Sequence, residues 1–140
     1  MQIAFFLLPK SETIFLLKNH TVRQALEKMQ YHEYVSVPLL NQEGQYVGAI
    51  TVADLLWYIK DAHDMSLADA EKVSLSQVPR LRDNKPVSIN AKVSDLFTMA
   101  MEQNFIPVVD DLGVFIGIVR RRDLMDFYQK KLKLEDEDKK

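Results

Sequence analysis

Two short stretches of the sequence combine residue types that could hold a phosphorylated ligand. They are Thr51-Val-Ala-Asp54 and Arg120-Arg121-Arg122-Asp123. Each comes at a predicted helix start, where free N–H groups and the helix dipole favour an anion. A hydroxyl or guanidinium group there can bond phosphate oxygens, and an aspartate three residues on can accept hydrogen bonds from ribose hydroxyls. Both stretches are therefore candidate nucleotide sites.

The two stretches differ in how strongly they indicate a ligand. Thr51 and Asp54 also fit an ordinary helix N-terminus with nothing bound. Three arginines at a helix start oppose the macrodipole, at about 0.3–1 kcal/mol each, and an anion would compensate them. We therefore expect replacement of Arg121 and Arg122 by methionine to weaken ligand binding without lowering the melting temperature. The alternative is a solvated cluster in which the arginines pair with nearby carboxylates: Asp110, Asp111 or Asp126.

A nucleotide base needs a flat apolar wall and backbone hydrogen bonds. Tyr34 could stack on a base, although an aromatic residue that enters a strand is as often part of the core. Ile106, next to Phe105, holds the equivalent place in the second half of the chain. The remaining candidates lie before or at the start of apolar segments: Thr13, Ile14, Phe15, Val35 and Ser36.

Other chemistries find little support in the composition. The absence of cysteine excludes disulfides, zinc–thiolate sites and thiol nucleophiles. His20, His32 and His63 have no carboxylate partners at ligand or relay spacing, and no Gly-rich phosphate loop is present. A net charge of -2 argues against nucleic acid as a partner. We therefore expect a binding protein without catalytic residues, metal or cofactor.

The chain contains an internal duplication. Apolar positions recur 69 residues later, such as Val37 with Ile106. Residues of special backbone or polar character follow the same offset: Pro38, Gly44, Gly48 and Asp54 match Pro107, Gly113, Gly117 and Asp123. A chance match at all of these positions is improbable, so the two halves are copies.

Each copy has the pattern of a β-α-β-β-α unit, with helical and strand periods alternating. We expect strands at 13–17, 35–40 and 46–50 and helices at 22–29 and 52–60, then strands at 86–89, 106–109 and 114–119 and helices at 93–100 and 121–131. One unit has a small core, so we expect the copies to pack with pseudo-twofold symmetry as one α/β (α+β) domain. Repeat one covers about 10–62, a connector about 63–85, repeat two about 86–132 and a charged tail 133–140.

The ends and the connector add three expectations. Residues 1–8 are apolar but fall short of the roughly 17–25 residues of a membrane span and lack signal-peptide features. We expect this run to pack on the domain or on a partner protein. We also expect the protein to be cytoplasmic. Ser66-Leu-Ala-Asp69 predicts a capping box that opens a short helix. The last six residues, all charged from Glu135 on, are expected to be frayed.

The whole pattern resembles a tandem pair of CBS (cystathionine β-synthase) domains, the Bateman module, over residues 10 to about 132. The resemblance is carried by VPLLNQEGQYVGAITVADLL from Val37 and IPVVDDLGVFIGIVRRRDLM from Ile106. It implies a regulatory sensor rather than an enzyme, with an adenine nucleotide bound between the repeats. It also implies a disc-like homodimer, which fits apolar stripes on the closing helices at Leu55, Leu56, Ile59, Leu124, Met125, Phe127 and Tyr128.

A narrower resemblance concerns the ligand. The stretches LLPKSETIFLLKNHTV and VPRLRDNKP are similar to the small stand-alone CBS proteins of Gram-positive bacteria that bind cyclic di-AMP. Their usual Thr-Arg-Arg or Thr-Arg-Lys is Arg120-Arg121-Arg122 here. The resemblance implies that residues 13–15 line the cleft of these arginines, and that a ppGpp synthetase or pyruvate carboxylase is the partner. The alternatives are an AMP, ADP or ATP sensor, favoured by Thr51 and Asp54, and a protein-interaction module with degenerate ligand sites.

Overall fold

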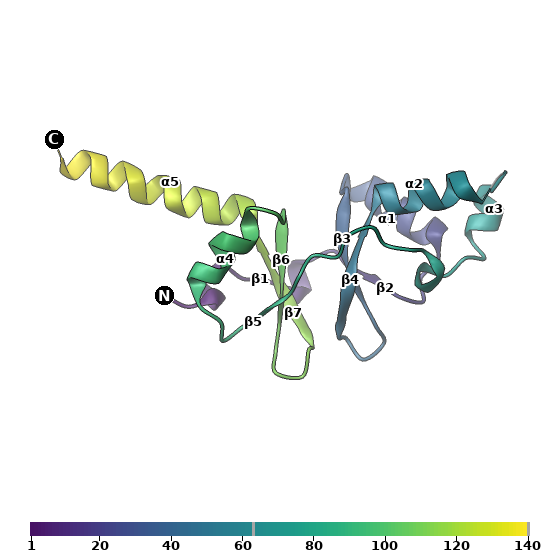
Figure 1. The fold of residues 1–140 in the computed structure, drawn as a ribbon, viewed down its shortest axis with the longest axis horizontal. Coiled ribbons are helices and arrows are strands. Elements are labelled where there is room, and N and C mark those ends of the chain that lie inside the picture. The colour runs from purple at the N-terminus through teal and green to yellow at the C-terminus, as the bar shows by residue number, and fades with distance from the viewer. Residues whose placement is uncertain (63, 140) are drawn as a thin grey trace.

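The computed structural model describes residues 1–62 and 64–139, and it confirms a mixed α/β fold built from two copies of one unit (Figure 1). His63, one of the three histidines considered above, lies outside the described residues. The two sheets lie side by side in the middle of the molecule, and the helices of each copy cover the outer face of its own sheet.

Both copies contain the predicted elements. The first copy has β2 (Leu16–Leu17), α1 (Val22–His32), β3 (Ser36–Leu40), β4 (Tyr46–Thr51) and α2 (Val52–Asp61). The second copy has β5 (Val87–Ser88), α4 (Val93–Ala100), β6 (Phe105–Val109), β7 (Phe115–Arg120) and α5 (Arg121–Asp138). The strands β3 and β6 each have a parallel neighbour on one side and an antiparallel hairpin partner on the other.

The strand register repeats with the sequence offset. Ser36 lies opposite Thr51 in the first hairpin, and Phe105 lies opposite Arg120 in the second. Both hairpins have a register shift at the same place, and both turns use a glycine at positive φ, 82° at Gly44 and 78° at Gly113. The two hairpins also bond to each other, since Phe115 N donates to Gly44 O at 2.9 Å. The copies are thus equivalent down to their turns.

The N-terminal segment packs on the second copy, as one of the two predicted alternatives stated. A 3-10 helix at Ile3–Phe6 buries both of its end residues in the core beneath α4 and α5. β1 (Leu8–Pro9) then pairs antiparallel with β7 and makes that sheet four-stranded. A Cβ at Gly117 would lie 2.2 Å from the Leu8 carbonyl oxygen, so the crossing needs glycine there.

Two local expectations were wrong. The first repeat has no strand at residues 13–15, because a 3-10 helix at Lys10–Glu12 precedes them and the Thr13 hydroxyl donates to Pro9 O at 2.9 Å. The charged tail was expected to be frayed, whereas α5 continues as a helix to Asp138, through a sequence without glycine or proline. Lys140 lies outside the described residues. The predicted capping box at Ser66 is confirmed at the start of α3 (Leu67–Ala70). Among the described helices, none is long and apolar enough to cross a bilayer.

Candidate functional site

The first cleft of interest lies between the two copies and has a volume of about 450 Å³. Repeat one supplies one wall, from the segment before β2 and from the start of β3. Repeat two supplies the opposite wall, from β6, β7 and the first turn of α5. The lining residues are Leu8, Glu12, Thr13, Ile14, Tyr34, Ser36, Val37, Pro38, Asn104, Phe105, Ile118, Arg120, Arg121, Arg122 and Met125. The sequence-predicted candidates Thr13, Ile14, Tyr34 and Ser36 therefore share one cleft with all three arginines.

The aromatic wall of this cleft is held by the end of α1. Glu33, at a φ of 60°, is the left-handed residue that ends the helix and turns the chain into β3. Tyr34 follows it with its ring about half exposed, and the His32 ring stacks on it at 5.8 Å between centroids and 21° between planes. Tyr34 thus offers a supported, accessible aromatic face at the cleft.

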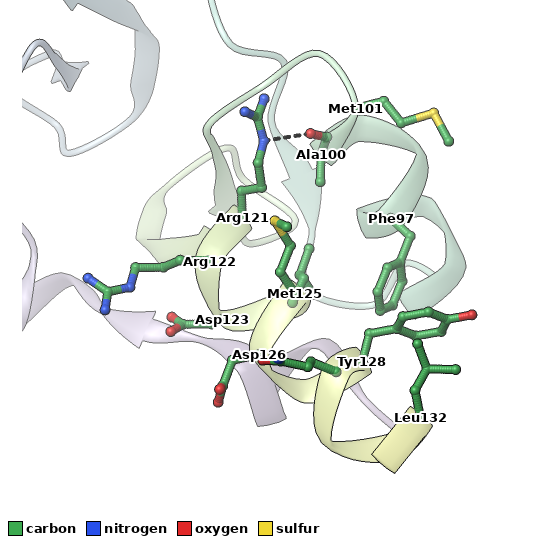
Figure 2. A pocket seen from close by; sticks show the side chains of 12 residues that line it. Phe97, Ala100, Met101, Arg121, Arg122, Asp123, Met125, Asp126, Tyr128 and Leu132 are labelled. Atoms are coloured by element: carbon green, nitrogen blue, oxygen red, sulfur yellow. Dashed lines mark hydrogen bonds between the residues drawn. The ribbon is translucent and has the colours of Figure 1, made fainter. Parts of the chain in front are cut away.

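The three arginines have three different environments. Arg120 bonds Asp123 with two contacts, Nε to Oδ2 at 2.8 Å and Nη2 to Oδ1 at 3.2 Å. Arg121 turns the other way, and its Nε donates to the carbonyl of Ala100 at 2.7 Å (Figure 2). Arg122 is exposed, and within residues 1–62 and 64–139 its side chain has no ion pair or hydrogen bond. The alternative pairing with Asp110, Asp111 or Asp126 is wrong, because Asp123 and main-chain carbonyls are the partners.

Four predicted residues lie outside the cleft lining. Ile106 is fully buried in the core of repeat two. Phe15 is not among the lining residues, and Lys10 Nζ and Lys28 Nζ lie 5.3 and 5.7 Å from its ring centroid. Val35 is 69% exposed at the start of the hairpin. Asp123 contributes through its pair with Arg120 and lines the neighbouring cavities instead.

Thr51 and Asp54 form a closed arrangement. The Thr51 side chain accepts from Asp54 N at 3.0 Å, and Asp54 Oδ2 accepts from Thr51 N at 2.9 Å, which is a complete capping box. The other oxygen, Oδ1, accepts from Leu81 N at 2.9 Å, and Asp54 is only 2% exposed. Both residues are therefore fully engaged in holding α2 and the connector.

Sequence reasoning missed several lining residues. Leu8 and Ile118 reach the cleft because β1 pairs with β7, a register that no repeat pattern indicates. Glu12 adds a carboxylate from the 3-10 helix before Thr13. Met125 was considered only as part of an apolar stripe, although its spacing of four from Arg121 places both on one helix face.

A second, larger hollow of about 960 Å³ lies between α4 and α5 (Figure 2). Apolar side chains dominate it, and several are more than half exposed, including Met101, Met125 and Tyr128. It shares Arg121, Arg122 and Met125 with the cleft between the copies. A ligand in that cleft would therefore touch residues that also shape this groove.

The described residues hold no group of three or more histidine, cysteine or acidic side chains placed to bind a metal ion. The cleft lining combines the arginine guanidinium groups with the hydroxyls of Thr13 and Ser36, the Glu12 carboxylate and the ring of Tyr34. Such a set can bind an anionic ligand that carries a flat ring system.

Comparison with known proteins identifies relatives of this arrangement. The CBS domain family model matches residues 8–61 and 76–130. A crystal structure of CbpB in complex with c-di-AMP has a TM-score of 0.85 at 19% identity, covering 98% of this chain and 91% of that one. CbpB of Listeria monocytogenes in complex with c-di-AMP scores 0.76 at 20% identity and 94% and 98% coverage. CBSX2 in complex with AMP scores 0.72 at 18% identity, covering 96% of this chain and 98% of that chain. At these identities the likeness shows a common fold, and no curated protein matches.

Proposed function

Because this chain belongs to the CBS-domain family, we propose that it is a regulatory protein that senses cyclic di-AMP in the cleft between its repeats. One observation carries the proposal: a cleft of about 450 Å³ brings Tyr34 and Thr13 of one repeat against Arg120 and Arg122 of the other. The resemblance to CbpB structures that hold c-di-AMP supports the choice of ligand.

The chemistry of the cleft suits the ligand. Cyclic di-AMP carries two phosphates and two adenines, so it needs cations close to flat apolar surfaces. Arg122 supplies a guanidinium group without an ion pair in the described chain, and planar guanidinium groups match phosphate oxygens. Tyr34 supplies the stacking face, and the Ser36 hydroxyl supplies a donor and an acceptor for a base edge.

We propose further that binding is passed on through the groove between α4 and α5. Arg122 and Met125 line both the cleft and the groove, so a ligand that reorients them alters the groove surface. Exposed apolar side chains there favour a protein contact, and we assign it to a second copy of this chain in a homodimer. The regulated partner would then bind the dimer. By resemblance, this partner is a ppGpp synthetase or pyruvate carboxylase in the cytoplasm.

A binding panel on the purified chain tests the proposal. Isothermal titration with cyclic di-AMP, cyclic di-GMP, AMP, ADP and ATP should give tight binding of cyclic di-AMP alone, with matching thermal stabilisation. Tighter binding of AMP, ADP or ATP would replace this proposal with a mononucleotide sensor, the ligand class of CBSX2. Absence of binding by all five compounds would favour an interaction module instead.

A further inference from the structure

One face of α5 changes in chemical character along its length. Arg121 and Arg122 line the start of the groove between α4 and α5. Exposed apolar side chains that also line the groove follow at the spacing of one helix face: Met125, Tyr128 and Leu132. The next positions at this spacing are Glu135 and Asp136. The face is therefore basic at its start, apolar in its middle and acidic at its end.

The acidic end of this face is poorly matched to its place in the helix. Residues 135–138 are all acidic, and the last turn of α5 holds no basic residue. Negative charges at a helix C-terminus interact unfavourably with the helix dipole. All four side chains are exposed, and none of them has an ion pair with another described residue. A cation from outside the helix would therefore stabilise this end.

A cation without a partner lies at the other end of the same helix. Arg122 is exposed and has no ion pair or hydrogen bond within residues 1–62 and 64–139. It precedes Glu135 by 13 residues, which is about 20 Å along a straight helix at 1.5 Å per residue. Figure 1 shows α5 projecting beyond α4, with its C-terminal end away from the rest of the molecule. The two side chains can therefore meet only between two chains.

Antiparallel pairing of two α5 helices brings these two ends together. A twofold axis midway between Met125 and Leu132 makes the Met125 of one copy face the Leu132 of the other. The same axis lies midway between Arg122 and Glu135, so these side chains face each other as well. Parallel pairing would instead place arginine against arginine and carboxylate against carboxylate, which is unfavourable. The charge pattern of the face is thus complementary to a second copy of itself in one orientation.

We propose that α5 of a second copy packs antiparallel into the groove and that its Glu135 forms an ion pair with Arg122. The carboxylate then occupies a guanidinium group that lines both the groove and the cleft between the repeats. An anionic ligand in the cleft has to displace it, so ligand binding weakens the dimer, and the dimer weakens ligand binding by the same factor. This competition rests on the proposed function, whereas the helix pairing rests on the groove and the charge pattern.

Cysteine cross-linking tests the orientation, because the chain has no cysteine of its own. Met125→Cys and Leu132→Cys each replace an exposed side chain, and circular dichroism should show that both variants fold. Under mild oxidation, a mixture of the two variants should form a disulfide between copies, whereas each variant alone should form little. Self-cross-linking of each variant alone would indicate parallel pairing and overturn the inference. A mixture that does not cross-link would overturn it too.

A charge substitution tests the ion pair. Glu135→Gln removes the carboxylate, and Glu137→Gln is the matched control, because position 137 is turned about 140° around the helix from Leu132. In sedimentation equilibrium at low salt, Glu135→Gln should raise the dimer dissociation constant about threefold to tenfold. Glu137→Gln should behave like the parent. In an Arg122→Met background, Glu135→Gln should have no further effect. Equal behaviour of the two glutamine variants would overturn the inference.

Titration with cyclic di-AMP separates this inference from the proposed function. At concentrations where the parent is dimeric, Glu135→Gln should bind the ligand about threefold to tenfold more tightly than the parent or Glu137→Gln. Equal affinities in the three proteins would overturn the competition at Arg122 and leave the proposed function standing. A parent that binds no cyclic di-AMP, while Glu135 and Arg122 remain coupled in dimer stability, would overturn the proposed function and leave the helix pairing standing.

Discussion

The guanidinium group of Arg121 caps the last turn of α4, with Nε 2.7 Å from the carbonyl oxygen of Ala100 and 3.1 Å from that of Gln103 (Figure 2). Carbonyls at a helix C-terminus lack internal partners and carry partial negative charge, so a cation there is stabilising. A cation at the start of α5 interacts unfavourably with that helix dipole. The bonds of Arg121 to the carbonyls of Ala100 and Gln103 offset this unfavourable interaction. Arg121 joins α5 to α4, and its role differs from that of Arg122.

Replacement of Arg121 by methionine should destabilise the protein without any ligand present. Two carbonyls lose a charged donor, and we expect the free energy of unfolding to fall by about 1–2 kcal/mol. This reverses the expectation drawn from the sequence, in which loss of Arg121 left stability unchanged. Urea denaturation measures the change. Arg23→Met is the control, and it should leave stability close to that of the parent, because Arg23 is an exposed arginine in surface ion pairs on α1.

Replacement of Arg122 by methionine should weaken cyclic di-AMP binding and leave the fold intact. A charge-assisted hydrogen bond contributes about 1.5–3 kcal/mol, so we expect affinity to fall about tenfold to hundredfold. The melting temperature without ligand should stay the same or rise slightly, because a cation is removed from a helix N-terminus. Calorimetry should measure the affinity for cyclic di-AMP of this variant and of the control variant Arg23→Met. Equal affinities in the two variants would contradict the assignment of Arg122 to the ligand.

Much of the architecture could be predicted from the sequence because its signals are local. The paired glycines at 44 and 113 and the prolines at 38 and 107 mark the same turns and strands in both copies. The direction of the Arg121 side chain could not be predicted, since its acceptor lies 21 residues earlier on another helix.

Similarly, the Leu81 bond to Asp54 joins residues 27 positions apart. Sequence patterns identify which residues can do chemistry at the cleft, and tertiary contacts decide which of them are already engaged. Thr13 and Tyr34 line the cleft, because short segments next to strand starts fix their position. Ile106 does not, because strand alternation turns it into the core.

Asp54 should be important for stability in its own right. Its buried carboxylate accepts from two main-chain donors, Thr51 N and Leu81 N. Asparagine in its place presents an NH₂ group to one of those donors, so we expect a loss of about 1–3 kcal/mol. Chemical denaturation should show this loss, whereas Asp61→Asn, on the exposed end of α2, should behave like the parent. A full-stability Asp54→Asn protein would mean that the connector does not depend on this carboxylate.

Stability should fall in mildly acidic solution because of His20. Burial, with a smaller contribution from Lys28, lowers the pKa of His20 below its ordinary value of 6.5, and its Nδ1 accepts from Leu17 N at 3.0 Å. Below about 6.5 the unfolded chain binds a proton that the folded chain resists, so stability is complete above this pH and decreases as the pH falls towards the lowered value. Urea midpoints at about pH 5 and about pH 8 should differ less in His20→Asn than in His32→Asn.

The groove between α4 and α5 should be the contact of the homodimer. Leu132 lies 44% exposed on the groove side of α5, whereas Leu134, 62% exposed, does not line the groove. Aspartate at either position removes an apolar side chain that the single chain leaves in solvent, so neither change should unfold the protein by circular dichroism. Leu132→Asp should dissociate the dimer in sedimentation velocity at micromolar concentration, because an unpaired carboxylate would be buried at the contact. Leu134→Asp should remain dimeric. Equal behaviour of the two variants, or a parent that sediments as a monomer, would rule out this groove as the dimer contact.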